Sequence, residues 1–342
     1  MMRAGRRRWW VAAVTLGAGM VATAQVARAG GGGVAAERGF PRRTVMAHRG
    51  LSSLAPELTL AAFAMARDVG ADYVETDIQR TRDGVLINIH DETFARTTNV
   101  SEVFPGREND PIGSFTLEEV RQLDAGAWFN EANPEQAMPG FVGLRVPTLE
   151  EYLEVLSQGT NRPGLLIEIK DPALYPGIEA QVLDMLVEKG WIDPAHSVRP
   201  CEPPPEGADV TVGCGPRRVI LQTFDPDSLA RLRSLAPSLI LNYLVDEEDA
   251  DEQGGFQPLL EWAVAQDAEI GAIGYLARPR NIRKTHREGR LFFVWTLDKP
   301  FHFRLAHILG VDGIITNRAH VYLELIGRPL SADPEALLAA YR

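Results

Sequence analysis

The sequence predicts an α/β fold, a TIM-type (β/α)8 barrel, from three observations. Short apolar and β-branched runs recur between residues 44 and 316, and helix-length stretches separate most of them. Near-continuous apolar strands that are each followed by a helix indicate a parallel sheet covered on both faces. There are eight or nine such strands, and the first lacks the Gly-x-Gly-x-x-Gly of a dinucleotide-binding sheet, so a closed barrel is favoured over a doubly wound sheet.

The first 29 residues have the three zones of a secretory signal peptide. Residues 1–8 are cationic, residues 9–27 are mostly apolar, and Ala27-Arg28-Ala29 has the small-x-small pattern of a cleavage site. We therefore expect an exported protein, periplasmic or extracellular. A retained membrane anchor is the alternative, and the choice between Sec and Tat export stays open.

The acidic composition excludes some partners. The chain has 342 residues, of which 35 are Lys or Arg and 46 are Asp or Glu, for a net charge of −11. Five arginines and no acid fall in residues 1–29, so the remainder, with 30 basic and 46 acidic residues, carries −16. Such a body is a poor partner for nucleic acid, and it argues against stable membrane association after signal removal. The oligomeric state is not indicated.

The rest of the chain divides by composition into three parts. Residues 30–43 are Gly-rich and predict a flexible lead-in, residues 44–325 form the barrel, and residues 326–342 are expected to form a C-terminal helix. The strand candidates are TVMAH (44–48), DYVETDI (72–78), VLINIH (85–90), LLIEIK (165–170), RVILQT (218–223), LILNYL (239–244), AIGY (272–275), LFFVWT (291–296) and GIIT (313–316).

Two segments interrupt this alternation of strands and helices. Only six residues, 79–84, separate the second and third strands, which is too few for a parallel crossover, so this link must be irregular. Residues 91–147 after the third strand form a long insertion with one clear helix at 116–124. Long loops after barrel strands usually lie over the active site.

Cys201 and Cys214 are the only cysteines. They bracket a segment whose Pro-rich first half cannot be helical, and an exported protein can close such a loop with a disulfide. A zinc site is the weaker alternative, because neither cysteine has a Cys-x-x-Cys neighbour or a nearby histidine.

Charged and aromatic side chains gather at the carboxyl ends of the predicted strands, where barrel enzymes carry their catalytic groups. Strand residues at i and i+2 face the same side, so two strands each place a pair of charges on one face. Unpaired, such burial costs several kcal/mol. The residues concerned are His48, Arg49, Glu75, Asp77, His90, Asp91, Glu168, Lys170 and, on a later strand, Trp295.

These charges have two interpretations. One is a structural ion pair, Glu168 with Lys170 or Asp77 with Arg80. The other is a bound cation, which is favoured because three carboxylates (Glu75, Asp77 and Glu168) converge from two strands without an equal number of nearby cations. Oxygen ligands alone select one hard divalent cation, Ca²⁺ or Mg²⁺.

His48 and His90 differ from the other five histidines because each closes a strand on the predicted active-site rim. Two imidazoles beside a metal suit acid–base catalysis of phosphoryl transfer near neutral pH. Arg49 and Lys170 can hold phosphate oxygens. Together these residues indicate phosphodiester cleavage.

Over residues 44–325, the sequence resembles the glycerophosphodiester phosphodiesterase family in the order and spacing of its motifs. The matching segments are MAHRG (46–50), APELT (55–59), VETDIQRTRDG (74–84), IHDETFARTTN (89–99), LDAGAWF (123–129), RVPTLEEYL (145–153), LIEIK (166–170), LQTFDPDSLARLR (221–233), VWTLD (294–298) and GVDGIITNR (310–318).

The resemblance implies a barrel with its insertion at 91–147, and metal-dependent hydrolysis of small glycerophosphodiesters to sn-glycerol 3-phosphate and an alcohol. It implies attack by the glycerol 2-hydroxyl, through a cyclic phosphate that water opens. The implied roles are cation binding by Glu75, Asp77 and Glu168, acid–base catalysis by His48 and His90, and phosphate binding by Arg49 and Lys170. Which histidine is the base in the first step is not indicated.

Some positions depart from the family pattern or leave alternatives open. The family usually has Asn where this chain has Leu58, a change expected to affect loop support or a polar contact beside the site; Asn317 stands where Asp is common. Trp295 is either a wall of the substrate site or a core indole. Trp128 and Phe129 are candidates for an apolar wall.

Two other functions compete with the implied one. A lysophospholipase D or sphingomyelinase D relative would need a large apolar rim, for which five insertion phenylalanines are candidates: Phe94, Phe104, Phe115, Phe129 and Phe141. A barrel that binds phosphodiesters without turnover would lack a histidine or a carboxylate, and none is missing.

Overall fold

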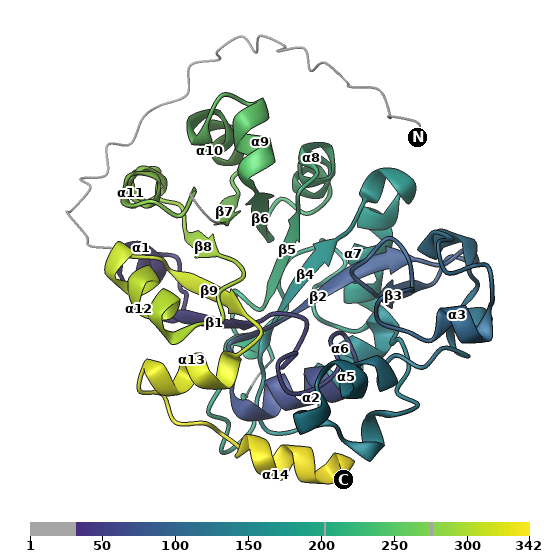
Figure 1. The fold of residues 1–342 in the computed structure, drawn as a ribbon. Helices are drawn as coiled ribbons and strands as arrows, with labels where there is room; N and C mark the ends of the chain where they lie inside the picture. The colour runs from purple at the N-terminus through teal and green to yellow at the C-terminus, as the bar shows by residue number, and fades with distance from the viewer. Residues whose placement is uncertain (1–31, 202, 274–275) are drawn as a thin grey trace.

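The computed structural model describes residues 32–201, 203–273 and 276–342, so the predicted signal peptide lies outside the described residues. Eight parallel strands close into a barrel, because β1 pairs with both β2 and β9. The predicted barrel is therefore confirmed (Figure 1). Its strands are β1 Thr44–Ala47, β2 Tyr73–Arg80, β4 Gly164–Ile169, β5 Val219–Thr223, β6 Ile240–Val245, β7 Glu269–Ala272, β8 Phe292–Val294 and β9 Gly313–Thr316.

The third predicted strand does not belong to the barrel. It is β3, Leu86–Asn88, which pairs antiparallel with β2 outside the closed ring. The six-residue link is too short for a crossover but suits a tight return, since the Thr81 amide donates to the Val85 carbonyl at 2.9 Å. The seventh predicted strand, 272–275, begins earlier than expected, because β7 begins at the buried Glu269, whose charge concealed the start of the strand. Residues 274–275 lie outside the described residues.

Helices cover the outside of the barrel (Figure 1). Some of them begin with a capping side chain; for example, Thr148 and Glu151 form a reciprocal capping box at the start of α6. Among the described residues, no helix is long and apolar enough to cross a membrane. The covering helices are α2 Leu60–Val69, α6 Leu149–Ser157, α7 Ile178–Glu188, α8 Pro226–Leu235, α9 Glu247–Glu252, α10 Phe256–Ala265, α11 Pro279–Arg287, α12 Pro300–Leu309 and α13 Ala319–Leu325.

The insertion packs around an apolar cluster of its own that includes Ile87, Phe94 and Phe115. The helix predicted at 116–124 is shorter than expected, because the chain turns after Val120. The helices of the insertion are α3 Val100–Val103, α4 Leu117–Val120 and α5 Ala127–Ala132, with short 3-10 turns between and after them.

Both ends of the described chain differ from their predictions. Residues 32–43 are not a loose lead-in, since α1, Gly32–Glu37, forms there. Val34 and Ala35 of this helix, and Phe40 after it, are buried against side chains of the barrel strands. The apolar contacts of this segment outweigh the flexibility of its glycines. The helix predicted over 326–342 is shorter than expected, because a turn follows Leu325 and α14, Pro334–Leu338, begins only at Pro334.

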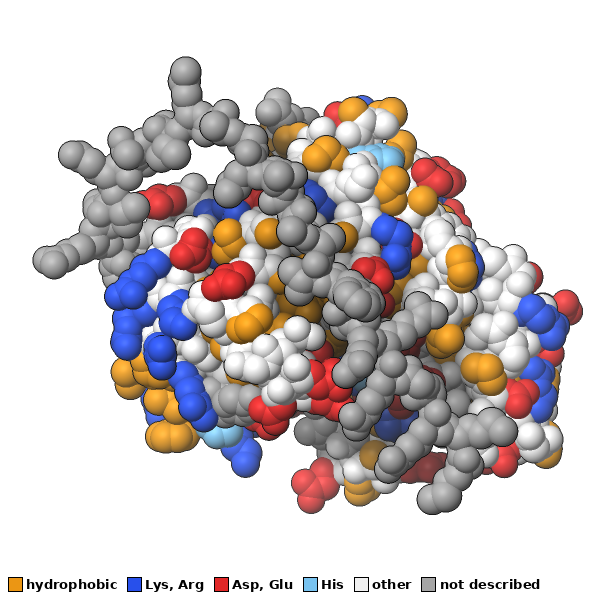
Figure 2. All heavy atoms as spheres, turned by 90° about the horizontal axis from the view of Figure 1, so that it is seen from above, with side chains coloured by type: hydrophobic (Ala, Val, Ile, Leu, Met, Phe, Trp, Pro, Cys, Tyr) orange, Lys and Arg blue, Asp and Glu red, His pale blue; other side chains and the backbone are white. Residues whose placement is uncertain are grey.

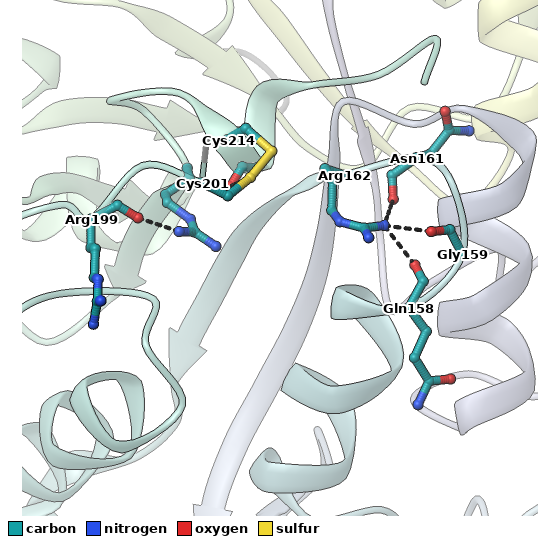
Figure 3. The surroundings of a disulfide bond; sticks show 9 residues. Gln158, Gly159, Asn161, Arg162, Arg199, Cys201 and Cys214 are labelled. Atoms are coloured by element: carbon teal, nitrogen blue, oxygen red, sulfur yellow. Dashed lines mark hydrogen bonds between the residues drawn. A yellow bond between two sulfur atoms is a disulfide. The ribbon is translucent and has the colours of Figure 1, made fainter. Parts of the chain in front are cut away.

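Cys201 and Cys214 form a disulfide that closes the loop before β5 (Figure 3). We expect its removal to lower the free energy of unfolding by about 3 kcal/mol, because the bridge restricts a loop of this length in the unfolded chain. Thermal unfolding of the double variant Cys201→Ser/Cys214→Ser, compared with wild type, measures this loss. An unchanged unfolding midpoint would contradict the expectation.

Candidate active site

A cleft of about 150 Å³ opens at the carboxyl ends of the barrel strands, where the strand-end residues predicted from sequence meet. It brings together side chains from both halves of the barrel. The lining residues are His48, Arg49, Glu75, His90, Glu168, Lys170, Gln222, Phe224, Leu244, Trp295, Thr296 and Ile315.

Three carboxylates form a buried cluster at this cleft. One oxygen from each of Glu75, Asp77 and Glu168 lies within 4.8 Å of the other two, and each residue is at most 7% exposed. Burial and repulsion from Asp77 and Glu168 raise the pKa of Glu75 well above its usual range. Burial and Asp77 also raise the pKa of Glu168. Ionisation of all three carboxyls is therefore unfavourable unless positive charge is added to the cluster.

The contacts of the cluster fit a cation better than an ion pair alone. Lys170 Nζ lies 2.9 Å from Glu168 Oε1, and the Arg49 amide donates to Glu75 Oε2 at 2.7 Å. Asp77 is different, because neither of its buried oxygens accepts a hydrogen bond and its nearest cation is Arg49 Nε at 3.5 Å. Arg80, the partner considered from sequence, instead donates to the Pro176 carbonyl. Three carboxylates with free lone pairs suit a hard divalent cation.

His48 is buried at the end of β1 and is held by an amide. Its Nδ1 lies 2.7 Å from Asn317 Oδ1, which can only accept, so Nδ1 carries the hydrogen and Nε2 keeps its lone pair. Burial, aided by the neighbouring Arg49 charge, lowers the pKa of His48 to about 4. At neutral pH this ring is therefore an uncharged acceptor.

His90 has a different partner. Its Nδ1 lies 2.7 Å from Asp91 Oδ1, and its Nε2 lies 3.4 Å from Lys170 Nζ. Partial burial opposes ionisation of Asp91, but hydrogen bonds from His90 and Arg96 hold the pKa of this carboxyl well below its usual range. The Asp91 carboxylate can only accept, so it fixes the Nδ1 hydrogen and the orientation of the ring. The two histidines thus differ in their partners, because a neutral amide holds His48 and a carboxylate holds His90.

Asp298 and Asn317 form a chain of hydrogen bonds behind His48 that was not predicted from the sequence. Asn317 Nδ2 donates to Asp298 Oδ2 at 2.6 Å, and the Ser52 hydroxyl donates to Asn317 Oδ1 at 2.9 Å. Asn317 therefore orients the His48 ring and is itself fixed by Asp298. Both residues lie in motifs that the sequence displays, VWTLD and TNR, and their position just after the last two strands was the available signal.

A second set of contacts joins the β1 end to the insertion. Glu57 binds Arg49 Nη1 at 2.8 Å and Arg96 Nη2 at 2.7 Å, while Arg96 Nε also contacts Asp91 Oδ2 at 2.5 Å. These ion pairs hold Arg49, which lines the cleft, and Asp91, which contacts the cleft residue His90. Sequence analysis assigned no role to Glu57 or Arg96.

The three aromatic residues predicted to wall the substrate site lie in different environments. Trp295 lines the cleft and meets Phe224 edge-on, with ring centroids 5.3 Å apart. Phe129 is buried against Phe141 and does not form a wall of the cleft, which corrects the prediction for that residue. Trp128 is half-buried, and its Nε1 donates to the Ala125 carbonyl at 3.0 Å.

The fold and this site define the class of protein, a (β/α)8-barrel enzyme whose charged cleft suits an anionic substrate. The family model "Glycerophosphoryl diester phosphodiesterase family" matches residues 48–321. A glycerophosphodiester phosphodiesterase of Bacillus subtilis is 33% identical over 278 residues, 81% of this chain and 84% of its own. One from Caldanaerobacter subterraneus is 33% identical over 82% of this chain and 97% of its own.

A solved structure agrees with these relatives. The crystal structure of a putative glycerophosphoryl diester phosphodiesterase from Silicibacter pomeroyi has a TM-score of 0.67 and 26% identity, covering 85% of this chain and 96% of its own. The chain therefore belongs to the glycerophosphoryl diester phosphodiesterase family, and it is an enzyme of that family.

Leu58, which departs from the family pattern, adopts a left-handed backbone with φ of 57°. Asn tolerates this conformation better than Leu does, which accounts for an Asn at this position. The Leu58 side chain is buried in the apolar core and does not line the cleft. The substitution therefore alters loop strain and packing instead of the chemistry of the site.

We accordingly expect Leu58→Asn to change kcat/KM by less than about threefold. The lost apolar burial should outweigh the relieved strain and lower the free energy of unfolding by about 1 kcal/mol or more. Steady-state kinetics and urea unfolding measure the two effects separately. A tenfold or larger change in kcat/KM would show that Leu58 acts on the site.

Proposed function

We propose that this enzyme is a metal-dependent hydrolase that releases sn-glycerol 3-phosphate and an alcohol from water-soluble glycerophosphodiesters. One observation carries the proposal: three buried carboxylates, one of them accepting no hydrogen bond, form a cluster at a cleft that is lined by two histidines and two cations. Carboxylates recruit a cation, cations recruit phosphate, and imidazoles move protons. The family membership supports the same substrate class.

The two histidines are proposed to have separate roles in the first step. His48 acts as the base, because its Nε2 is unprotonated and its Nδ1 is fixed by Asn317. It takes the proton of the glycerol 2-hydroxyl, whose oxygen attacks phosphorus to give a cyclic phosphate. His90, backed by Asp91, gives a proton to the departing alcohol oxygen. In the second step the roles reverse, as His90 activates water and His48 returns its proton.

The remaining charged residues position and stabilise the phosphate. Arg49 is held by Glu57 and Lys170 by Glu168, so both cations are fixed before the substrate arrives. Attack by a hydroxyl of the same molecule adds a large effective molarity. A divalent cation held by Glu75, Asp77 and Glu168 would supply positive charge that polarises the phosphate and acidifies the attacking hydroxyl.

The insertion supports a soluble substrate over a lysolipid. Four of its five phenylalanines are buried, and the fifth, Phe104, is partly buried against the same cluster as Phe94 and Phe115. They therefore offer little apolar rim for an acyl chain. A binding-only barrel is not favoured either, because every acid–base and carboxylate residue expected from the family pattern is present in the cleft or its acidic cluster.

We also propose that the enzyme works outside the cytoplasm, in the periplasm or the extracellular space. The signal-like composition of residues 1–29 supports export. The Cys201–Cys214 disulfide supports it independently, because such bonds persist in oxidising compartments. Amino-terminal sequencing of the protein recovered from culture medium and periplasm would test the site of cleavage.

The test of the proposed function compares two substrates. The purified enzyme, supplied with Ca²⁺ or Mg²⁺, is incubated with glycerophosphocholine and separately with lysophosphatidylcholine. We expect sn-glycerol 3-phosphate and choline from the first, with kcat/KM at least 100-fold above that for the second. Activity on lysophosphatidylcholine alone would identify the enzyme as a lysophospholipase D. The absence of product from both substrates would favour a barrel that binds phosphodiesters without turnover.

A further inference from the structure

Helix α12 carries an apolar face that no described residue covers. Phe301, Leu305 and Ile308 are 69%, 41% and 81% exposed, and they are among only seven large apolar side chains exposed in the described chain. Their i, i+4, i+7 spacing places all three on one side of the helix. Phe303 and Ala306, on the other side, are buried. The helix is thus apolar on two sides, and only one of them packs against the protein.

The segment that contains α11 and α12 is rich in cations. Residues 278–308 include eight Lys or Arg and two acids, a local charge of +6 in a chain whose net charge is −11. Arg280, Arg283 and Arg287 are exposed along one side of α11, and within the described part of the chain none of the three is paired with a carboxylate. Arg304 is exposed on α12 itself.

The two helices lie on the same flank of the barrel. α11 follows β7 and α12 follows β8 along the chain, and these two strands pair directly. Both helices lie on the left of the view in Figure 1. Figure 2 shows Lys and Arg side chains gathered along that same edge, next to hydrophobic side chains. We call the surface formed by Arg280, Arg283, Arg287, Phe301, Leu305 and Ile308 the α11–α12 face.

We propose that the α11–α12 face binds the surface of an anionic lipid bilayer. Exposed aromatic and aliphatic side chains enter the interfacial region, and arginines bind the phosphate groups around them. The acidic net charge does not prevent this, because salt screens charges more than about 8–10 Å from the bilayer. The positive charge of the face itself therefore determines whether it binds the bilayer. This proposal revises the expectation, drawn from composition, that the protein has no stable membrane association.

A second copy of the chain is a poorer occupant of this face. A symmetric dimer places the same patch on both sides of its interface, so two clusters of unpaired arginines would meet and repel. A bilayer that carries acidic lipids offers the opposite charge over a wide area, together with an apolar interior. Trp295 and Thr296 of the cleft precede Phe301 by only a few residues, so a bilayer bound here would lie on the flank next to the catalytic opening.

The experiment measures binding of the exported enzyme, with its processed amino terminus verified by mass spectrometry, to vesicles by co-sedimentation. One vesicle set contains equal parts of phosphatidylglycerol and phosphatidylcholine, and the other contains phosphatidylcholine alone. We expect strong binding to the first set only. Arg280→Gln/Arg283→Gln/Arg287→Gln should lower the partition coefficient about 100-fold, since each cation contributes roughly fivefold.

Two further variants separate this face from general surface effects. Phe301→Ser/Ile308→Ser should also weaken binding at least tenfold, whereas Val142→Ser/Leu235→Ser, which removes exposed apolar groups elsewhere, should leave it unchanged. All variants should keep the unfolding midpoint and the turnover of soluble substrate. Equal binding to both vesicle sets, or wild-type binding by the face variants, would overturn the proposal. A dimer in light scattering that the face variants convert to monomer would overturn it as well.

Discussion

Replacement of His48 or His90 by Ala is expected to lower kcat/KM for glycerophosphocholine by about a thousandfold or more. A positioned acid or base contributes roughly 10²–10⁴-fold, and in the proposed reaction each histidine acts in both steps. His48 Nε2 is poised to accept a proton and His90 is held by the Asp91 carboxylate. Neither ring is needed to close the barrel, so the fold should persist.

The matched control for both histidine variants is His302→Ala, an exposed histidine on α12 that does not line the cleft. It should retain wild-type kcat/KM. Circular dichroism and the unfolding midpoint verify that each variant is folded. A histidine variant with turnover within tenfold of wild type would remove that residue from the acid–base assignment.

Asp77→Asn is expected to have opposite effects on cation binding and on stability. Asp77 accepts no hydrogen bond, and its one cation, Arg49 Nε, lies 3.5 Å away. Two other buried carboxylates surround it, so removing its charge relieves repulsion and should raise the free energy of unfolding of the cation-free protein by about 1 kcal/mol or more. The same change removes a charged ligand and should weaken Ca²⁺ or Mg²⁺ binding at least 100-fold. Calorimetric titration and thermal unfolding measure the two effects.

Asp72→Asn is the matched control for this prediction. Asp72 is also a buried carboxylate, but it accepts hydrogen bonds from the Val45 amide at 2.8 Å and from Arg328 Nη1 at 2.7 Å. The loss of this paired charge should destabilise the protein, by about 3 kcal/mol or more, and leave cation affinity unchanged. If Asp77→Asn destabilised the cation-free protein as Asp72→Asn does, the cluster would be a structural ion pair and not a cation site.

The sequence contained enough information for the barrel and for the residues in its cleft. Parallel strands leave their carboxyl ends on one face, so charged residues at i and i+2 of a buried strand could be placed together without knowledge of the helices. That reasoning brought Glu75 and Glu168 into one cluster. The third predicted strand is different, because its short link to β2 allows an antiparallel return but no parallel crossover. His90, two residues after β3, reaches the cleft from there.

Longer-range features were not predictable from local patterns. The segment around α1 is Gly-rich, and only the finished barrel supplies the interior surface that buries Phe40. The Asp298–Asn317–His48 chain joins residues up to 269 positions apart, and no spacing rule connects them. The left-handed backbone of Leu58 could not be predicted either, because Leu rarely adopts a positive φ and its presence in the sequence does not signal one.

The most direct test of the account is the cation dependence of product formation. The purified wild-type enzyme is stripped with a chelator, freed of it, and given glycerophosphocholine with no cation, with Ca²⁺ or with Mg²⁺, while phosphorus NMR follows the products. We predict sn-glycerol 3-phosphate only when a divalent cation is restored. Full turnover by the stripped enzyme would contradict the assignment of Glu75, Asp77 and Glu168 as the ligands of a cation required for catalysis.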